Sequence, residues 1–207
     1  LKNISLTIAK RKVTAIVGPS GAGKSTLINL LLKLYAAQRG KITIDGINIL
    51  DLTHHSYLKL IGYVGQETFI FNGTIRDNIR YGNLKATEEE IHAAAETAYI
   101  DHFVHTLPGG YDMVINEESS NISQGQKQLL TIARAILANP RILILDEATS
   151  SVDTRTEVLI QKAMENLMQG RTTFGPSWPW GDPRISTSLR PMSSEKSRIR
   201  LWHRCMR

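Results

Sequence analysis

The segment from residue 18 to residue 26 constrains the fold of this chain more than any other. It reads Gly-Pro-Ser-Gly-Ala-Gly-Lys-Ser-Thr and fits the pattern G-x-x-x-x-G-K-[S/T]. The apolar run Val13–Val17 precedes it and predicts a buried strand, and helical spacing follows over Lys24–Leu34. A glycine-rich turn without a ligand is the alternative, and the flanking strand and helix argue against it. The segment therefore predicts a phosphate-binding loop whose backbone N–H groups point at an anion.

The residue types of this loop suit a nucleoside triphosphate with Mg²⁺. We expect Lys24 to reach the β- and γ-phosphates and the Ser25 hydroxyl to ligate Mg²⁺. The expected nucleotide contacts come from every residue of the loop: Gly18, Pro19, Ser20, Gly21, Ala22, Gly23, Lys24, Ser25 and Thr26.

Two adjacent carboxylates follow a second apolar run. Arg141–Leu145 predicts a buried strand, and Asp146 and Glu147 come directly after it. Because the carboxyl ends of parallel strands meet at one edge of a sheet, we expect these side chains beside the phosphate loop. Asp146 is then a Mg²⁺ ligand and Glu147 the general base for an attacking water. A solvated acidic turn is the alternative. It is the weaker one, because such carboxylates and a phosphate loop recur together in P-loop NTPases.

The remaining patterns describe an α/β chain without a membrane span. Asp45-Gly46 between two short apolar segments predicts a hairpin over 41–50. No run of about 18 apolar residues occurs, and Cys205 is the only cysteine, so an internal disulfide is excluded. Three further segments have helical patterns: Glu88–Tyr99 after Thr87 as N-cap, Ser123–Ala138, and Thr154–Met168.

The net charge of +6 lies entirely in the last part of the chain. Residues 171–207 hold eight Lys/Arg and two Asp/Glu, so residues 1–170 carry 17 of each and are balanced. All three tryptophans also fall in this part, after residue 174. We expect 1–174 to be the folded domain and 175–207 to be a basic, disordered tail. Only this basic tail would favour a nucleic-acid partner, and we expect no nucleic-acid binding.

Several segments together resemble the nucleotide-binding domain of ABC transporters of the exporter type. Asn121-Ile-Ser-Gln-Gly-Gln-Lys-Gln128 is similar to the family's signature motif, with Gln124 in place of its first glycine. Tyr63–Glu67 resembles the Q-loop, and the following segment up to Ile79 is typical of exporters. Ser150–Asp153 resembles the D-loop. Without the resemblance, Ser123 is an N-cap and Gln66 a surface residue.

The resemblance implies a complete ATPase arrangement. It implies a mainly parallel sheet, an N-terminal antiparallel β part and a helical subdomain over about 75–138. Ser123, Gly125 and Gln126 then bind the γ-phosphate held by a second nucleotide-binding domain, identical or not, in a head-to-tail dimer. Gln66 contacts Mg²⁺ or the lytic water, and Asp153 belongs to the dimer interface. A transmembrane exporter domain is the implied second partner, at the cytoplasmic face of the cell membrane.

Two family features are missing from the sequence. The family stacks adenine on an aromatic residue some way before the strand predicted here at 13–17, and this chain begins after that position. The switch histidine is replaced by Trp178 after Gly170-Arg-Thr-Thr, and His203 lies too late to serve. The family pattern is thus truncated at both ends. We expect impaired hydrolysis, and we hypothesise a frameshift near codon 175, with a divergent tail as the alternative.

Two other functions stay open on the sequence alone. The chain fits a soluble ABC-class ATPase without a transport role, although the exporter-type segment after Gln66 argues against that. It also fits an inactive, truncated ATP-binding fragment that occupies a partner's interface.

Overall fold

The computed structural model describes residues 4–65, 67–116, 122–146, 152–176 and 200–204. A five-stranded sheet in the order β4-β7-β8-β1-β9 forms its centre. β1 (Val13–Val17), β4 (Ile61–Val64), β7 (Ile142–Leu145) and β8 (Thr172–Pro176) are parallel, and β9 (Arg200–Arg204) pairs antiparallel with β1. The predicted strand over 13–17 is confirmed, and the fold is an α/β fold with a mainly parallel sheet, as predicted.

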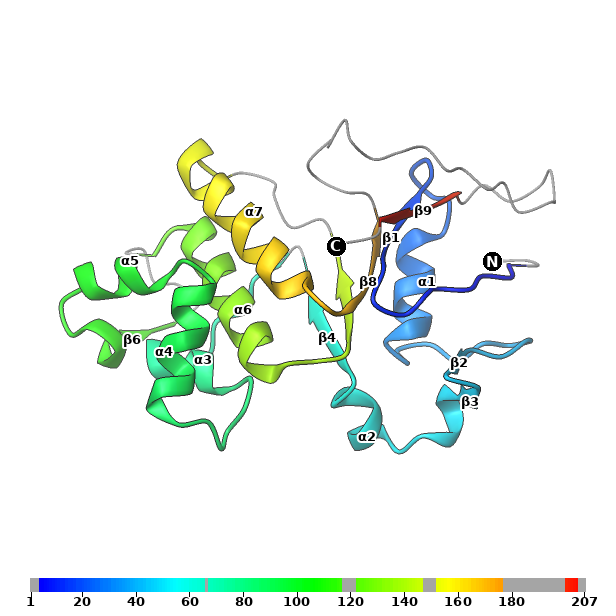
Figure 1. Ribbon diagram of the computed structural model, residues 1–207, viewed down its shortest axis with the longest axis horizontal. Coiled ribbons are helices and arrows are strands. Elements are labelled where there is room, and N and C mark those ends of the chain that lie inside the picture. The colour runs from blue at the N-terminus through cyan, green and yellow to red at the C-terminus, as the bar shows by residue number, and fades with distance from the viewer. Residues whose placement is uncertain (1–3, 66, 117–121, 147–151, 177–199, 205–207) are drawn as a thin grey trace.

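Helix α1 (Lys24–Leu31) lies on one side of this sheet, in the right half of Figure 1. A small core of Ile16, Leu27 and Phe174 joins it to β1 and β8. The helix is shorter than the predicted 24–34, because Lys33 adopts a positive φ of 58°. The Lys33 ammonium donates to the carbonyls of Ile49 and Leu52 at 2.7 and 3.1 Å, which anchors the end of α1 on the following segment.

The predicted hairpin is confirmed but short. β2 (Thr43–Ile44) and β3 (Ile47–Asn48) flank Asp45 and Gly46, whose φ angles of +51° and +86° match a type I′ turn. The side chain of Asn48 then caps the 3₁₀ turn η1 (Ile49–Asp51), which ends the strand. Helix α2 (His54–Leu58) leads into β4.

A helical lobe occupies the left half of Figure 1. Its largest helix, α6, runs from the predicted cap to the predicted end and stops where Asn139 turns left-handed. Buried apolar side chains of α3 (Ile75–Arg80), α4 (Glu88–Thr97) and α6 form one continuous core with those of α7 (Thr154–Met168). The elements are β5 (Gly73–Thr74), α3 (Ile75–Arg80), α4 (Glu88–Thr97), α5 (Asp101–Thr106), the 3₁₀ turn η2 (Gly110–Asp112), β6 (Val114–Ile115) and α6 (Gln124–Ala138).

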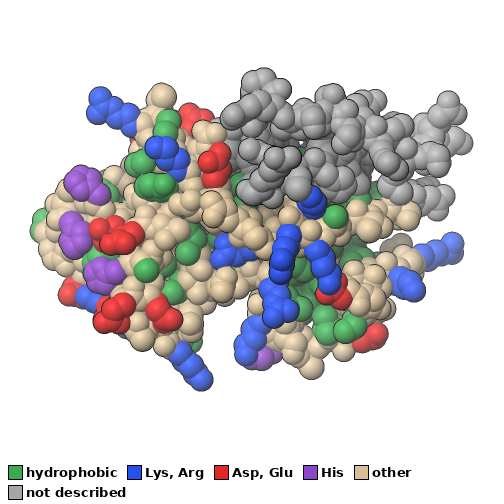
Figure 2. Space-filling model, viewed as in Figure 1, with side chains coloured by type: hydrophobic (Ala, Val, Ile, Leu, Met, Phe, Trp, Pro, Cys, Tyr) green, Lys and Arg blue, Asp and Glu red, His purple; other side chains and the backbone are tan. Residues whose placement is uncertain are grey.

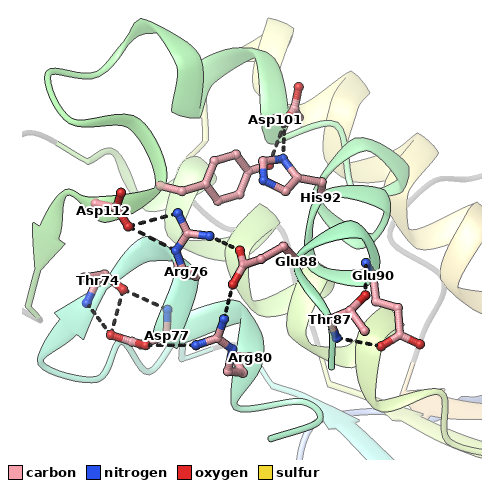
Figure 3. Close-up of polar contacts among 11 residues, drawn as sticks. Thr74, Arg76, Asp77, Arg80, Thr87, Glu88, Glu90, His92, Asp101 and Asp112 are labelled. Carbon is pink, nitrogen blue, oxygen red and sulfur yellow. Dashed lines mark hydrogen bonds and ion pairs between the residues drawn. The ribbon is translucent and has the colours of Figure 1, made fainter. Parts of the chain in front are cut away.

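Local capping and ion pairs hold the first helices of this lobe together. Thr74 and Thr87 each begin a helix with a capping box, and the Thr87–Glu90 box matches the sequence prediction. Arg76 and Arg80 on α3 both reach Glu88 at the start of α4, and Arg76 also pairs with Asp112 (Figure 3). Such partly exposed pairs are worth little one by one, so their main effect is to orient α3 against α4.

A buried polar contact ties α6 to the segment that leaves β4. Asn78 is fully buried, and its side chain bonds both the N–H and the carbonyl of Phe71 at 2.9 Å. Arg134 on α6 donates to the Asn78 carbonyl at 2.8 Å and to the Phe69 carbonyl at 3.1 Å. Because a buried polar group is costly without partners, these bonds fix the course of residues 69–71.

The last elements connect the helical lobe to the sheet. α7 (Thr154–Met168) packs on α6, and β8 follows it to Pro176, two residues beyond the predicted domain end. Residues 200–204 of the tail expected to be disordered form β9 here, and 177–199 and 205–207 lie outside the described residues. Across the described part of the chain, no helix is long and apolar enough to cross a bilayer.

Candidate functional site

The loop after β1 has a backbone that only glycine adopts easily. Gly21 and Gly23 have φ angles of +73° and +97°, a region that is unfavourable for residues with a Cβ atom. The N–H of Ala22 donates to the Pro19 carbonyl at 3.1 Å and closes a tight turn. The loop then enters α1 at Lys24 without a side-chain cap, so the first amides of the helix have no intrahelical partner.

The charges at this helix start favour an anion. No acidic residue lies in the first turn of α1, and the helix dipole adds a partial positive charge there. The Lys24 ammonium folds over the loop and donates to the carbonyls of Gly18 and Pro19 at 2.8 and 3.2 Å. Ser25 and Thr26 are exposed at the same helix start. Backbone amides, a lysine and two hydroxyls thus all lie at this helix start, a set of donors that suits an anion.

The strand register places Asp146 at the same edge of the sheet as this loop. The N–H of Asp146 donates to the Val64 carbonyl at 2.8 Å and extends the β4–β7 ladder by one residue. β8 separates β7 from β1, with Ile144 opposite Phe174 and Pro176 opposite Ile16. Two strand spacings are about 10 Å, a distance that one hydrated ion and a phosphate can bridge. The predicted neighbourhood of Asp146 and the phosphate loop thus agrees with the register.

Tyr63 is a site residue that the sequence pattern did not single out. Its hydroxyl lies 3.5 Å from Oδ2 of Asp146, across the β4–β7 pair. Burial of the Tyr63 ring and the charge of Asp146 both raise the pKa of the phenol, so it stays protonated and can donate. No sequence signal pointed to this contact, because it depends on the pairing of β4 with β7.

The proposed catalytic residues Gln66 and Glu147 lie outside the described residues, in the segments that follow β4 and β7. Of the residues before them, Val64 and Asp146 lie at the carboxyl edge of the sheet. The expected roles of these two side chains therefore remain predictions.

The signature segment forms the start of α6, away from the phosphate loop. Ser123 caps the helix, with its hydroxyl accepting from the N–H of Gln126 at 3.3 Å. The Gln126 side chain accepts from the N–H of Ser123 at 2.8 Å and completes a capping box. In Figure 1, α6 and α1 lie on opposite sides of the sheet, so the two motifs of this chain do not meet each other.

Gln124, which replaces the first glycine of the signature motif, contacts the segment after β4. Its side-chain amide donates to the Thr68 hydroxyl at 2.9 Å. The start of α6 is thus linked directly to the Q-loop segment, a contact that the sequence did not predict. A glycine at position 124 has no side chain to make this bond.

Asp153 caps the neighbouring helix α7. Its Oδ1 accepts from the N–H groups of Arg155 and Thr156 at 3.1 and 3.0 Å. The hydrogen bonds from Thr156 lower the pKa of this carboxyl, which therefore stays charged at neutral pH. Ser123 and Asp153 accordingly lie at the starts of two helices that pack side by side.

Gly125 is required by this close approach of α6 and α7. A Cβ atom at position 125 would lie 2.4 Å from Thr156 Cγ2 and 2.7 Å from Val152 Cγ1. We expect Gly125→Ala to lower the free energy of unfolding by about 1 to 2 kcal/mol, since overpacking outweighs the better helix propensity of alanine. Thermal denaturation measures the change. Thr156→Ser removes one of the clashing methyl groups, so adding it should recover part of the loss, and no recovery would contradict this packing.

The fold and the loop define a class of protein. A parallel sheet with a glycine-rich loop between β1 and α1, and a carboxylate after β7, is a P-loop nucleotide-binding domain. The sequence profile described as "ABC transporter" matches residues 1–150 of the chain. The chain therefore belongs to the ABC transporter family, whose ATP-binding domains hydrolyse ATP.

Individual relatives agree with this family. The uncharacterized ABC transporter ATP-binding protein YfiC of Bacillus subtilis is 54% identical over 84% of this chain and 29% of its own length. A fatty acid ABC transporter ATP-binding/permease protein of Mycobacterium bovis is 51% identical over 84% of this chain and 28% of its own. A bacterial Atm1-family ABC exporter with ATP bound is 43% identical, with a TM-score of 0.76 over 84% of this chain and 30% of that one.

The chain thus spans less than a third of the length of these relatives. The region that matches the family, residues 1–150, includes both the phosphate loop and the helices α3–α6.

Proposed function

We propose that this chain is the ATP-binding and ATP-hydrolysing part of an ABC exporter. The observation that carries the proposal is the uncapped start of α1 behind a glycine loop, with Lys24 folded over it. In this proposal the loop amides and Lys24 hold the β- and γ-phosphates of ATP. ATP supplies the phosphoanhydride bond whose hydrolysis drives the cycle.

Mg²⁺ fits the oxygen donors at this edge of the sheet. Mg²⁺ prefers hard oxygen ligands and keeps several waters, so one or two protein oxygens are enough. Ser25 offers an exposed hydroxyl at the helix start, and Asp146 a carboxylate on the other side of β8. Tyr63 donates to that carboxylate and orients it, and Gln66 is the further proposed ligand.

The separation of α6 from α1 supports a dimer as the active form. Ser123, Gly125 and Gln126 belong to the start of α6, and α6 lies on the other side of the sheet from α1 (Figure 1). A second nucleotide-binding domain placed head to tail would bring one chain's Ser123 to the other chain's ATP. Asp153 starts the helix beside α6 and is proposed to lie in the same interface.

Export across a membrane is supported by the relatives, which include a fatty acid ABC transporter and an Atm1-family ABC exporter. We propose that a transmembrane exporter domain is the second partner and that the chain works at the cytoplasmic face of the cell membrane. Gln124 binds Thr68, and Arg134 binds the Phe69 carbonyl. A displacement of residues 68–71 by the transmembrane domain would therefore also move α6.

We propose that the chain binds Mg-ATP but hydrolyses it slowly. Glu147 is the proposed general base and Gln66 the residue that positions water, and Trp178 stands where the family has its switch histidine. A soluble ATPase without transport has no specific observation in its favour. An inert partner that binds ATP without turnover is the second candidate, because of Trp178.

Isothermal titration of the chain with Mg-ATP and with Mg-AMP tests the proposal. A site built on a phosphate loop gains its affinity from the β- and γ-phosphates, so we expect saturable binding of ATP and at least a 100-fold weaker response to AMP. Equal affinity for the two nucleotides, or no ATP binding, would overturn the proposed function.

A further inference from the structure

Two histidines and one carboxylate come together on the surface of the helical lobe. His92 belongs to α4, and Asp101 and His105 belong to α5, one helical turn apart. One ligand atom from each of the three lies within 4.8 Å of the others. Oδ1 of Asp101 lies 3.4 Å from Nε2 of His105 and 3.9 Å from Nδ1 of His92.

This cluster is remote from the phosphate loop. Figure 2 shows histidine side chains at the end of the molecule that α5 occupies in Figure 1, and α1 lies in the opposite half. The cluster therefore takes no part in the proposed Mg-ATP site. In Figure 3, His92 and Asp101 point toward each other above the Arg76–Glu88 pairs, so the cluster is also separate from these ion pairs.

Tyr111 holds the three side chains in place. Its hydroxyl donates to Oδ1 of Asp101 at 2.6 Å. Its ring centroid lies 4.1 Å from that of His92 and 5.9 Å from that of His105. Ligands of metal sites are commonly oriented by such outer hydrogen bonds and packing. Tyr111 is itself buried and anchored in the core of the lobe, which makes it a firm support.

The donor set selects the kind of metal. Imidazole nitrogens suit Zn²⁺, Cu²⁺ and Ni²⁺, whereas Mg²⁺ and Ca²⁺ take oxygen ligands. His105 lies one helical turn from Asp101, and His92 lies across the connection between α4 and α5. Two histidines and one carboxylate are the ligand set of zinc sites that keep one coordination position open. Ligand atoms this close need only small side-chain rotations to meet a Zn–N distance of about 2.0 Å.

We propose that His92, Asp101 and His105 form a Zn²⁺ site that braces α4 against α5. The ion would tie the two helices across the turn at 98–100. The site would stabilise the helical lobe rather than take part in hydrolysis.

Titration of the metal-free full chain with ZnCl₂ tests the site, with no nucleotide present. We expect one Zn²⁺ per chain, and at least tenfold weaker binding in His92→Ala and in His105→Ala, since each loses one of three ligands. His105 is exposed, so its replacement should leave the fold intact, which circular dichroism checks. Zinc at 100 times its Kd should raise the Tm of the unsubstituted chain by about 5 to 10 °C and that of His105→Ala by much less.

Matched variants separate this site from other zinc ligands. His102→Ala removes an exposed histidine of α5 outside the cluster and should leave zinc affinity unchanged. Cys205→Ser removes the only thiol and should also leave it unchanged. An excess of Mg²⁺ should not displace zinc. The proposal is overturned if zinc does not bind, if His92→Ala and His105→Ala bind it normally, or if Cys205→Ser alone abolishes binding. The variants should leave ATP binding unchanged, because the cluster lies away from the phosphate loop, so a failure here leaves the proposed function standing.

Discussion

Replacement of Lys24 by alanine is expected to weaken Mg-ATP binding by about 100-fold. The Lys24 ammonium lies at the mouth of the phosphate loop, 2.8 Å from the Gly18 carbonyl, and it is the basic side chain of the first turn of α1. Charge-assisted hydrogen bonds to a phosphate contribute up to about 3 kcal/mol, and each 1.4 kcal/mol is tenfold in affinity. Isothermal titration of both proteins with Mg-ATP measures the change.

A second lysine variant controls for general charge effects. Lys59→Ala removes an exposed lysine at the end of α2 and should leave ATP affinity within about twofold. The Tm of Lys24→Ala should stay close to that of the unsubstituted chain, because the lost bonds join a flexible amine to carbonyls of the loop. Normal ATP affinity in a folded Lys24→Ala protein would contradict the proposed phosphate site.

Replacement of Glu147 by glutamine is expected to lower ATP turnover by at least 100-fold while leaving ATP affinity nearly unchanged. A positioned general base contributes about 10² to 10⁴ in rate, and glutamine keeps the size of the side chain but cannot accept the proton. Because ATP then stays intact between the two domains, a dimer should accumulate in the presence of Mg-ATP. Phosphate release measures turnover, and light scattering after size exclusion measures the dimer.

Glu165→Gln is the matched control, since Glu165 is an exposed carboxylate on α7 far along the helix from Asp153. It should change neither turnover nor the fraction of dimer. Turnover that persists in Glu147→Gln would show that another group is the base. Equal dimer in the unsubstituted chain and in Glu147→Gln, with no turnover in either, would favour the inert partner instead.

The local elements of the fold were predictable because their signals lie within a few residues. The apolar run Val13–Val17 became β1, and the predicted caps Thr87 and Ser123 each begin a helix. The positive φ at Asp45 and Gly46 follows from a turn that glycine and aspartate tolerate. Two predicted helices were too long at their C-terminal ends, because Lys33 and Tyr99 adopt a left-handed backbone that no local sequence pattern indicated.

The site was predictable in its parts and only partly in its arrangement. Gly18–Thr26 and Asp146 could be named from the sequence because phosphate and Mg²⁺ binding demand particular residue types at particular places in a strand and a helix. Tyr63 could not be assigned to Asp146, because the bond crosses from β4 to β7, 83 positions along the chain. The Gln124–Thr68 bond could not be predicted for the same reason, because its residues are 56 positions apart in the sequence.

The sequence by itself determined the loop, the helices begun by Thr87 and Ser123, the strands at 13–17 and 142–145, and hence the class of nucleotide-binding domain. Tertiary structure alone decided that β8 lies between β1 and β7, that Asn78 and Arg134 tie α6 to Phe69–Phe71, and that His92 meets His105. The physical reason is range: backbone propensity and capping act over one or two turns, whereas register and packing depend on which distant surfaces bury each other.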